Sequence, residues 1–112
     1  MTISTNDIIK NFKLFGERIS KNMSDNAVNS YFFKLYNAVR YEDVETFSLI
    51  FTRIIVLSDY DKKHDLLELL NQSLYENRNS SYSNTSIMQI ILMAFLSGYY
   101  EKVKEDGEED SA

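Results

Sequence analysis

The chain has 112 residues, of which 44% are hydrophobic, a formal net charge of −5 at pH 7, and no cysteine or proline. This length and composition predict one folded domain with a substantial core, with disorder only at the ends. The absence of cysteine excludes disulfides, thiolate metal sites and a cysteine nucleophile. A reducing, cytoplasmic location fits this composition.

Apolar residues recur at helical spacing along almost the whole chain, without the sustained alternation of a strand. A first helix is expected from about Asp7 to Asn22, with Ser4, Thr5 or Asn6 available as its cap. Its apolar stripe consists of Ile8, Phe12, Phe15, Ile19 and Met23.

A second helix is expected to begin near Ser24 or Asp25, and Tyr41, Glu42 and Asp43 form a short connector to a third helix over about residues 43–57. The acidic connector suits the N-terminus of the following helix. The apolar residues of the second helix are Val28, Tyr31, Phe32, Leu35 and Val39, and those of the third are Val44, Phe47, Phe51, Ile54 and Ile55.

The segment 58–61 is expected to cap a fourth helix that continues to about Tyr75, with Leu66, Leu67, Leu70 and Leu74 as its apolar residues. A polar loop over residues 76–86 follows, and Asn84 or Thr85 caps a fifth helix. This helix is apolar on most sides over residues 87–100, which predicts a central position in the bundle. A run of 14 residues is too short to cross a bilayer, which takes about 20.

The sequence therefore predicts an all-α protein, a compact bundle of about five helices over residues 1–104. Residues 105–112 carry five acidic residues and no basic one, and we expect them to form a disordered acidic tail.

The charge is unevenly distributed, because this tail accounts for the whole net charge of the chain. Residues 1–40 contain six basic and three acidic side chains, whereas residues 41–104 contain six basic and nine acidic ones. The body is therefore neutral overall and has a basic N-terminal part. Wheel positions place several basic side chains away from the apolar stripes.

These side chains are the candidate contacts to nucleic-acid phosphates: Lys10, Lys13, Lys21, Lys34, Arg40 and Arg53. The alternative is an ordinary solvated surface, since dedicated nucleic-acid domains usually have a pI above about 9. We expect both arginines to be exposed. A structural ion pair with Glu42, Asp43 or Glu45 is the alternative for them.

The sequence contains few of the residues and motifs from which enzyme active sites are built. His64 is the only histidine, and its neighbours Asp61, Asp65 and Glu68 share helical spacing with it without making a convincing metal site. No glycine-rich phosphate loop or nucleophile elbow is present. We expect a protein that is not an enzyme, with no cofactor, no bound metal, no small-molecule substrate and no membrane contact.

Two further features have simple structural explanations. The tyrosines offer stacking platforms for bases or anchors for a partner, although most should lie half-buried at the rim of the bundle, with Tyr82 the most exposed. Gly16 and Gly98 fall inside predicted helices, where each costs about 1 kcal/mol relative to alanine. A close crossing of two helices explains them.

Three segments together resemble the small subunit of type I CRISPR Cascade complexes: FGERI, FFKLYNAVRYEDVETFSLIFTRI and AFLSGYYEK. A similar helical domain forms the C-terminal part of the large subunit in some type I systems. The resemblance covers roughly residues 8–104 and consists of helical architecture and hydrophobic spacing. It contains no catalytic or ligand-binding motif.

The resemblance implies a non-catalytic protein of antiviral defence, built into an RNA-guided surveillance complex. Copies would stack head to tail and contact the backbone subunits. Lysine and arginine side chains would contact guide RNA, target DNA or the displaced strand without reading sequence. The chain departs from this pattern in charge, since its body is neutral and its tail acidic, which favours protein contacts.

Two other functions remain open. One is a helical adaptor or regulator that acts through protein contacts alone. The other is a helix-turn-helix DNA reader, which is disfavoured because no short glycine-containing turn precedes a basic helix.

Overall fold

The structure is a computed structural model that describes residues 4–21, 25–76 and 83–111, without the side chains of Asp25, Val28 and residues 105–111. Over these ranges the chain forms helices and no strand, which confirms the predicted all-α bundle. The elements in order are α1 (Thr5–Ile19), α2 (Asp25–Arg40), α3 (Val44–Leu57), α4 (Lys63–Asn71), a π-helical turn η1 (Gln72–Glu76) and α5 (Asn84–Ser111).

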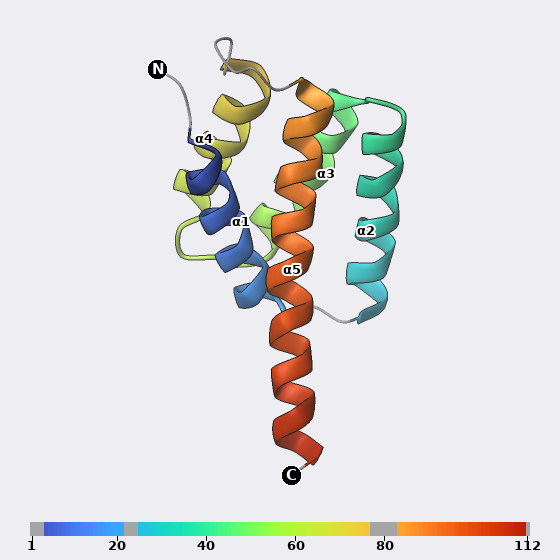
Figure 1. The fold of residues 1–112 in the computed structure, drawn as a ribbon, viewed down its shortest axis with the longest axis vertical. Coiled ribbons are helices and arrows are strands. Elements are labelled where there is room, and N and C mark those ends of the chain that lie inside the picture. Colours follow the sequence, from blue (N-terminus) through green and yellow to red (C-terminus); the bar gives the residue numbers. More distant parts are fainter. Residues whose placement is uncertain (1–3, 22–24, 77–82, 112) are drawn as a thin grey trace.

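Helix α5 runs through the middle of the bundle, and α1, α2, α3 and η1 pack against it (Figure 1). Its most extensive neighbour is α1, while α2 and α3 form an antiparallel pair and α4 follows beside α1 and α3. At its C-terminal end α5 extends past the other helices, which gives the molecule a long axis of 48 Å against 25 and 22 Å across.

Helix α1 begins after Ser4, which has the extended backbone of an N-cap but makes no side-chain cap bond. Its predicted apolar stripe is buried from Ile8 to Ile19. The helix ends earlier than expected, at Ile19, where the Ser20 hydroxyl donates to the Glu17 carbonyl oxygen. Met23, the last predicted member of the stripe, lies outside the described residues.

The predicted fourth helix begins later than expected. The Ser58 hydroxyl donates to the Ile55 carbonyl oxygen and closes the end of α3, Asp59 has a left-handed φ of 57°, and Tyr60 turns its ring into the core. Residues 58–61 therefore form a turn, and α4 begins only at Lys63. Beyond Asn71 the backbone widens into the π-helical turn, and Leu74 stays buried.

The loop prediction falls mostly on residues 77–82, outside the described residues, and Tyr82 with it. Ser83, one residue before the expected caps, holds the start of α5, because its hydroxyl oxygen accepts from the Ser86 amide at 3.2 Å. The α5 backbone remains helical to Ser111 instead of ending near residue 104, and no proline interrupts it. The acidic side chains of this segment lie outside the described side chains, and disorder of residues 105–112 in solution stays a prediction.

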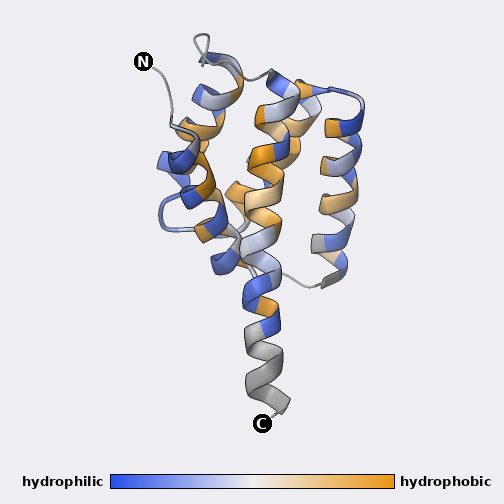
Figure 2. Ribbon diagram, in the orientation of Figure 1, coloured by the Kyte–Doolittle hydropathy of each residue, from blue (hydrophilic) through white to orange (hydrophobic). Residues whose placement is uncertain are grey.

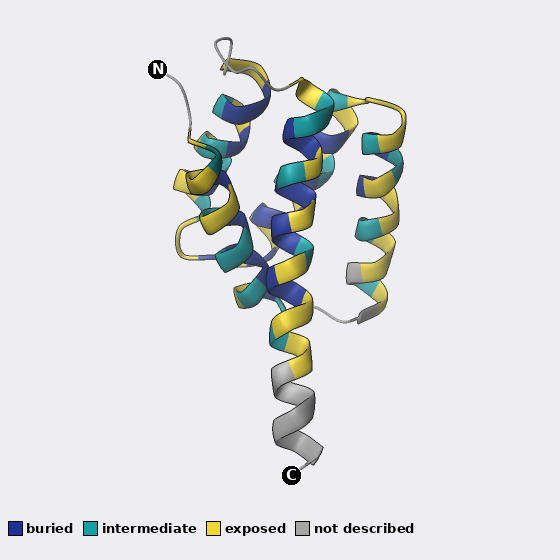
Figure 3. Cartoon of the chain, in the orientation of Figure 1, coloured by how far each residue is buried: buried dark blue, intermediate teal, exposed yellow. Residues whose placement is uncertain are grey.

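The core is an aromatic cluster contributed by four helices. The Phe51 ring lies 5.1 Å from that of Phe95 and 5.4 Å from that of Phe12, both edge to face. The Phe15 and Phe32 rings each lie 5.5 Å from the Phe95 ring. Figure 2 shows the hydrophobic turns of α3 and α5 at the centre, and Figure 3 shows that burial follows them. The predicted apolar faces therefore point inward.

The two helical glycines lie where α1 and α5 cross. A Cβ atom on Gly16 would overlap the Phe95 carbonyl oxygen and lie 2.9 Å from the Tyr99 amide nitrogen. A Cβ atom on Gly98 would overlap the Lys13 carbonyl oxygen. Backbone atoms cannot move aside as a flexible side chain can, so this spacing needs glycine on both helices. The predicted close crossing is confirmed.

In the part of the chain that the structure describes, no helix combines the length and apolar character needed to cross a bilayer.

Gly98→Ala should destabilise the protein by about 1–3 kcal/mol or more, because the added methyl group forces α1 and α5 apart. Helix propensity alone predicts the opposite sign, a gain of about 1 kcal/mol. Urea unfolding followed by circular dichroism measures the difference. Ser97→Ala, at the exposed neighbouring position, is the control and should be nearly neutral. A stabilised Gly98→Ala protein would show that the helices do not approach this closely.

Phe51→Ala and Phe95→Ala should each lower the free energy of unfolding by about 3–5 kcal/mol, because both side chains are fully buried in the aromatic cluster. The same substitution at Phe33, whose side chain is 67% exposed, is the matched control and should change stability by less than about 0.5 kcal/mol. Losses below about 1 kcal/mol at both core sites would mean that α3 and α5 present other faces to the core.

Candidate functional site

The six predicted phosphate contacts are spread over three helices. Five of them are exposed, and Lys13 is partly buried. They lie on or just after α1 (Lys10, Lys13 and Lys21), on α2 (Lys34 and Arg40) and on α3 (Arg53). No single basic patch contains all six.

Lys13 has a structural role. Its Nζ lies 3.2 Å from Oε2 of Glu101, and the two side chains are 41% and 56% exposed. This pair joins α1 to α5 beside the Gly98 crossing, although an exposed ion pair contributes only about 0–1 kcal/mol. A lysine held this way is a weaker phosphate contact than an unpaired one.

Arg40 and Arg53 are both exposed, as predicted. The Arg40 guanidinium carbon lies 5.7 Å from the centre of the Tyr41 ring, a contact worth about 0.5–1 kcal/mol at an exposed site. The alternative, an ion pair with a carboxylate of the α2–α3 connection, does not occur among the described residues. Both charges are therefore available to an anionic ligand or partner.

Only Lys34 and Arg53 come together. Both line a groove of about 560 Å³ between α2 and α3, which also contains Leu49, Val56 and Leu57. A smaller hollow of about 290 Å³ continues this groove toward the α2–α3 connection and shares Lys34 with it. We call this feature the α2–α3 groove.

One end of the groove is bordered by the sharp connection between the two helices. Glu42 has a left-handed φ of 56°, and Asp43 caps α3. The two Asp43 carboxylate oxygens accept from the Thr46 amide at 3.1 Å and from the Thr46 hydroxyl at 2.6 Å. These hydrogen bonds lower the pKa of the Asp43 carboxyl below its ordinary value of 3.8. The bond from the Thr46 hydroxyl has the larger effect and the bond from the Thr46 amide the smaller one.

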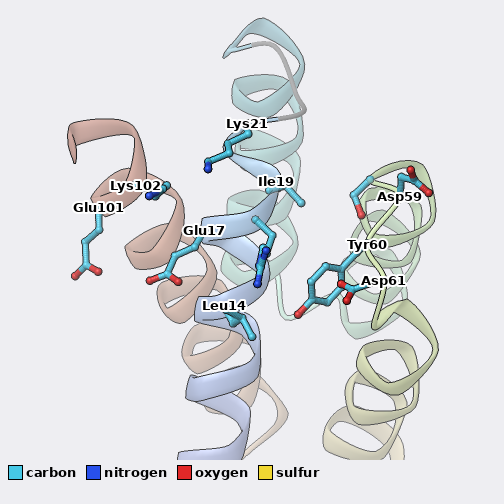
Figure 4. A pocket seen from close by; sticks show the side chains of 11 residues that line it. Leu14, Glu17, Ile19, Lys21, Asp59, Tyr60, Asp61, Glu101 and Lys102 are labelled. Carbon is cyan, nitrogen blue, oxygen red and sulfur yellow. The ribbon is translucent and has the colours of Figure 1, made fainter. Parts of the chain in front are cut away.

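Lys21 lies in a different setting, a pocket of about 500 Å³ around the C-terminal turn of α1 (Figure 4). Tyr60 enters this pocket from the α3–α4 connection, and burial raises the pKa of its phenol, with a further increase from Asp61 and a decrease from Arg18. The pocket is lined by four acidic and three basic side chains: Glu17, Asp59, Asp61 and Glu101, with Arg18, Lys21 and Lys102. This mixture disfavours a phosphate at Lys21.

The tyrosines and His64, the other candidate features, also differ in their exposure. Tyr60 and Tyr99 are buried, whereas Tyr36, Tyr41 and Tyr100 are more than half exposed. His64 is exposed, and among the described residues no group of three histidine, cysteine or acidic side chains could hold a metal ion. The absence of enzymatic activity stays a prediction.

Sequence reasoning overlooked the exposed apolar side chains of the groove. Leu49 is 70% exposed, Val56 53% and Leu57 65%. Leu49 and Val56 are seven residues apart, which places them on one face of α3, out of phase with the buried Phe47–Ile55 face. This second set of apolar residues at helical spacing, on a face of α3 other than the buried one, is the pattern in the sequence that indicates the exposed apolar surface.

Comparison with protein families, with curated proteins and with solved structures finds no match to this chain.

Asp43→Ala should lower the melting temperature at neutral pH, because the Thr46 hydrogen bonds are lost. The folded-state pKa is lowered, so the part of the stabilisation that depends on the carboxylate charge is present above pH 3.8 and is lost as the pH falls through that lowered pKa. The difference in melting temperature between the two proteins should therefore be smaller well below pH 3.8 than at neutral pH. Asp43→Asn, which keeps a cap oxygen without the charge, should retain most of the stability. A pH-independent difference would contradict this role of the carboxylate.

Proposed function

We propose that the chain is a non-catalytic small helical subunit of an RNA-guided CRISPR effector complex. It would contact other subunits, further copies of itself, and the backbones of guide RNA and target DNA. The segments that carry the resemblance form the last turn of α1, most of the α2–α3 pair and the crossing part of α5. They supply both the aromatic core and most of the exposed arginines and lysines considered above.

The observation that carries the proposal is the set of exposed cations without carboxylate partners among the described residues: Lys10, Lys34, Arg40 and Arg53. Their spread over three helices suits contact with a polyanion along more than one face, without base recognition. The weak contacts expected from a neutral body add up when several copies line one duplex.

A second candidate, a helical adaptor that never meets nucleic acid, is supported by a different observation. Leu49, Val56 and Leu57 expose large apolar side chains beside Lys34 and Arg53, a combination more typical of protein interfaces than of phosphate contacts.

The test is reconstitution with effector subunits from the same source. The chain should co-purify with them, and the complex that lacks it should bind target DNA more weakly. Replacement of Lys10, Lys34, Arg40 and Arg53 with glutamine should weaken binding equally for different target sequences. Each lost phosphate contact should reduce the log–log salt slope by about 0.7–0.9.

Arg18→Gln with Lys62→Gln is the control for charge, compared with Lys10→Gln with Arg40→Gln, because both double variants remove two positive charges. Only the Lys10 and Arg40 variant should change the salt slope. A chain that fails to join the subunits contradicts the effector proposal. A chain that joins them with unchanged DNA affinity and salt slope in the variants acts as an adaptor.

A further inference from the structure

The α2–α3 groove exposes apolar surface that the fold itself does not need. Helix α3 buries one face through Phe47, Phe51 and Ile54, and that face already completes the core. The opposite face presents Leu49 and Val56, which are 70% and 53% exposed. Clustered exposed apolar side chains on a globular protein mark a binding surface.

The exposed stripe has the dimensions of a helix-docking site. Leu49 and Val56 are two helical turns apart, about 10 Å along α3. Leu57 lies at one end of the groove, and the half-buried Tyr31 ring lines the α2 side. A partner helix with apolar residues at positions i, i+3, i+4 and i+7 presents a stripe of the same length.

The polar side chains of the groove define the charge of that partner. Lys34 stands on the α2 side and Arg53 on the α3 side, and both are exposed. No carboxylate lines the larger part of the groove, and Asp43, which lines the smaller hollow, accepts hydrogen bonds from Thr46. Neither cation has an ion-pair partner among the described residues. Two cations beside an apolar stripe are complemented by carboxylates that flank an apolar stripe.

Two other occupants fit less well. Single-stranded nucleic acid binds through aromatic stacking surfaces and cations, whereas the exposed side chains here are chiefly aliphatic. The acidic residues 105–112 of a second copy match the charge, but they contain only a terminal alanine to fill an apolar groove.

We propose that the α2–α3 groove binds an amphipathic helix of a protein partner, with an apolar stripe that covers Leu49 and Val56 and flanking acidic side chains that pair with Lys34 and Arg53. This function goes beyond nucleic-acid contact, and the groove would serve it whether or not the chain belongs to an effector complex.

The test uses two synthetic helical peptides of about five turns, with leucine at i, i+3, i+4, i+7 and i+11. One has glutamates beside the leucine stripe and the other has lysines at the same positions. The peptides are titrated into the full ¹⁵N-labelled chain, and amide shifts are followed by NMR. The glutamate peptide should bind at least about tenfold more tightly and shift the amides around Lys34 and from Leu49 to Leu57.

Charge reversal provides the decisive variant. Lys34→Glu with Arg53→Glu should invert the preference, so that the lysine peptide binds more tightly. Lys10→Glu with Arg40→Glu makes the same change in net charge outside the groove and should leave the preference unchanged. Circular dichroism verifies that each variant remains helical.

The apolar contribution has its own matched pair. Leu49→Ser should weaken the glutamate peptide about tenfold, whereas Met93→Ser on α5, at an equally exposed position, should not. The proposal is overturned if the glutamate peptide does not bind, if the shifts lie elsewhere, or if charge reversal fails to invert the preference. Self-association that protects the groove amides, or an oligonucleotide that shifts them in place of the peptide, would also overturn it.

Discussion

The close crossing of α1 and α5 is the constraint on which the rest of the bundle depends. Because Gly16 and Gly98 have no Cβ, the two backbones pass within direct contact, with the Phe95 carbonyl oxygen where a Gly16 methyl group would lie. This approach brings the apolar stripe of α1 onto α5 and leaves the far side of α5 to α2 and α3. The flexibility that glycine gives the unfolded chain opposes folding, and the dense packing at the crossing offsets it.

The aromatic cluster transmits this arrangement to the other helices. Phe51 contacts rings from α1 and α5, and Phe32 brings α2 onto Phe95 and Tyr99. Tyr60 joins the cluster through Phe15, with ring centres 5.1 Å apart, and thereby fixes the turn between α3 and α4. The same helices that meet in the core carry the surface features, so the α2–α3 groove has a rigid base.

The basic side chains on the surface have different surroundings, and these suit them to different roles. Lys13 is paired with Glu101, and Lys21 lies in a pocket of mixed charge. Lys34 and Arg53 share a groove with exposed leucine and valine, whereas Lys10 and Arg40 lie outside it. A protein that contacts both subunits and a nucleic-acid backbone needs such a division, because apolar area supplies contact with a protein and isolated cations supply contact with phosphates.

The sequence by itself determined the helical class, the inward faces and the exposure of Arg40 and Arg53, because periodic burial is encoded locally in the spacing of apolar residues. It also indicated that Gly16 and Gly98 mark a crossing, but not that the two glycines meet across the same pair of helices. Only the tertiary structure decided that residues 58–61 form a turn, since the burial of Tyr60 depends on distant Phe15. It also decided that Lys34 and Arg53 share one groove while Lys13 reaches Glu101, because side-chain partners on different helices depend on helix packing that no local pattern specifies.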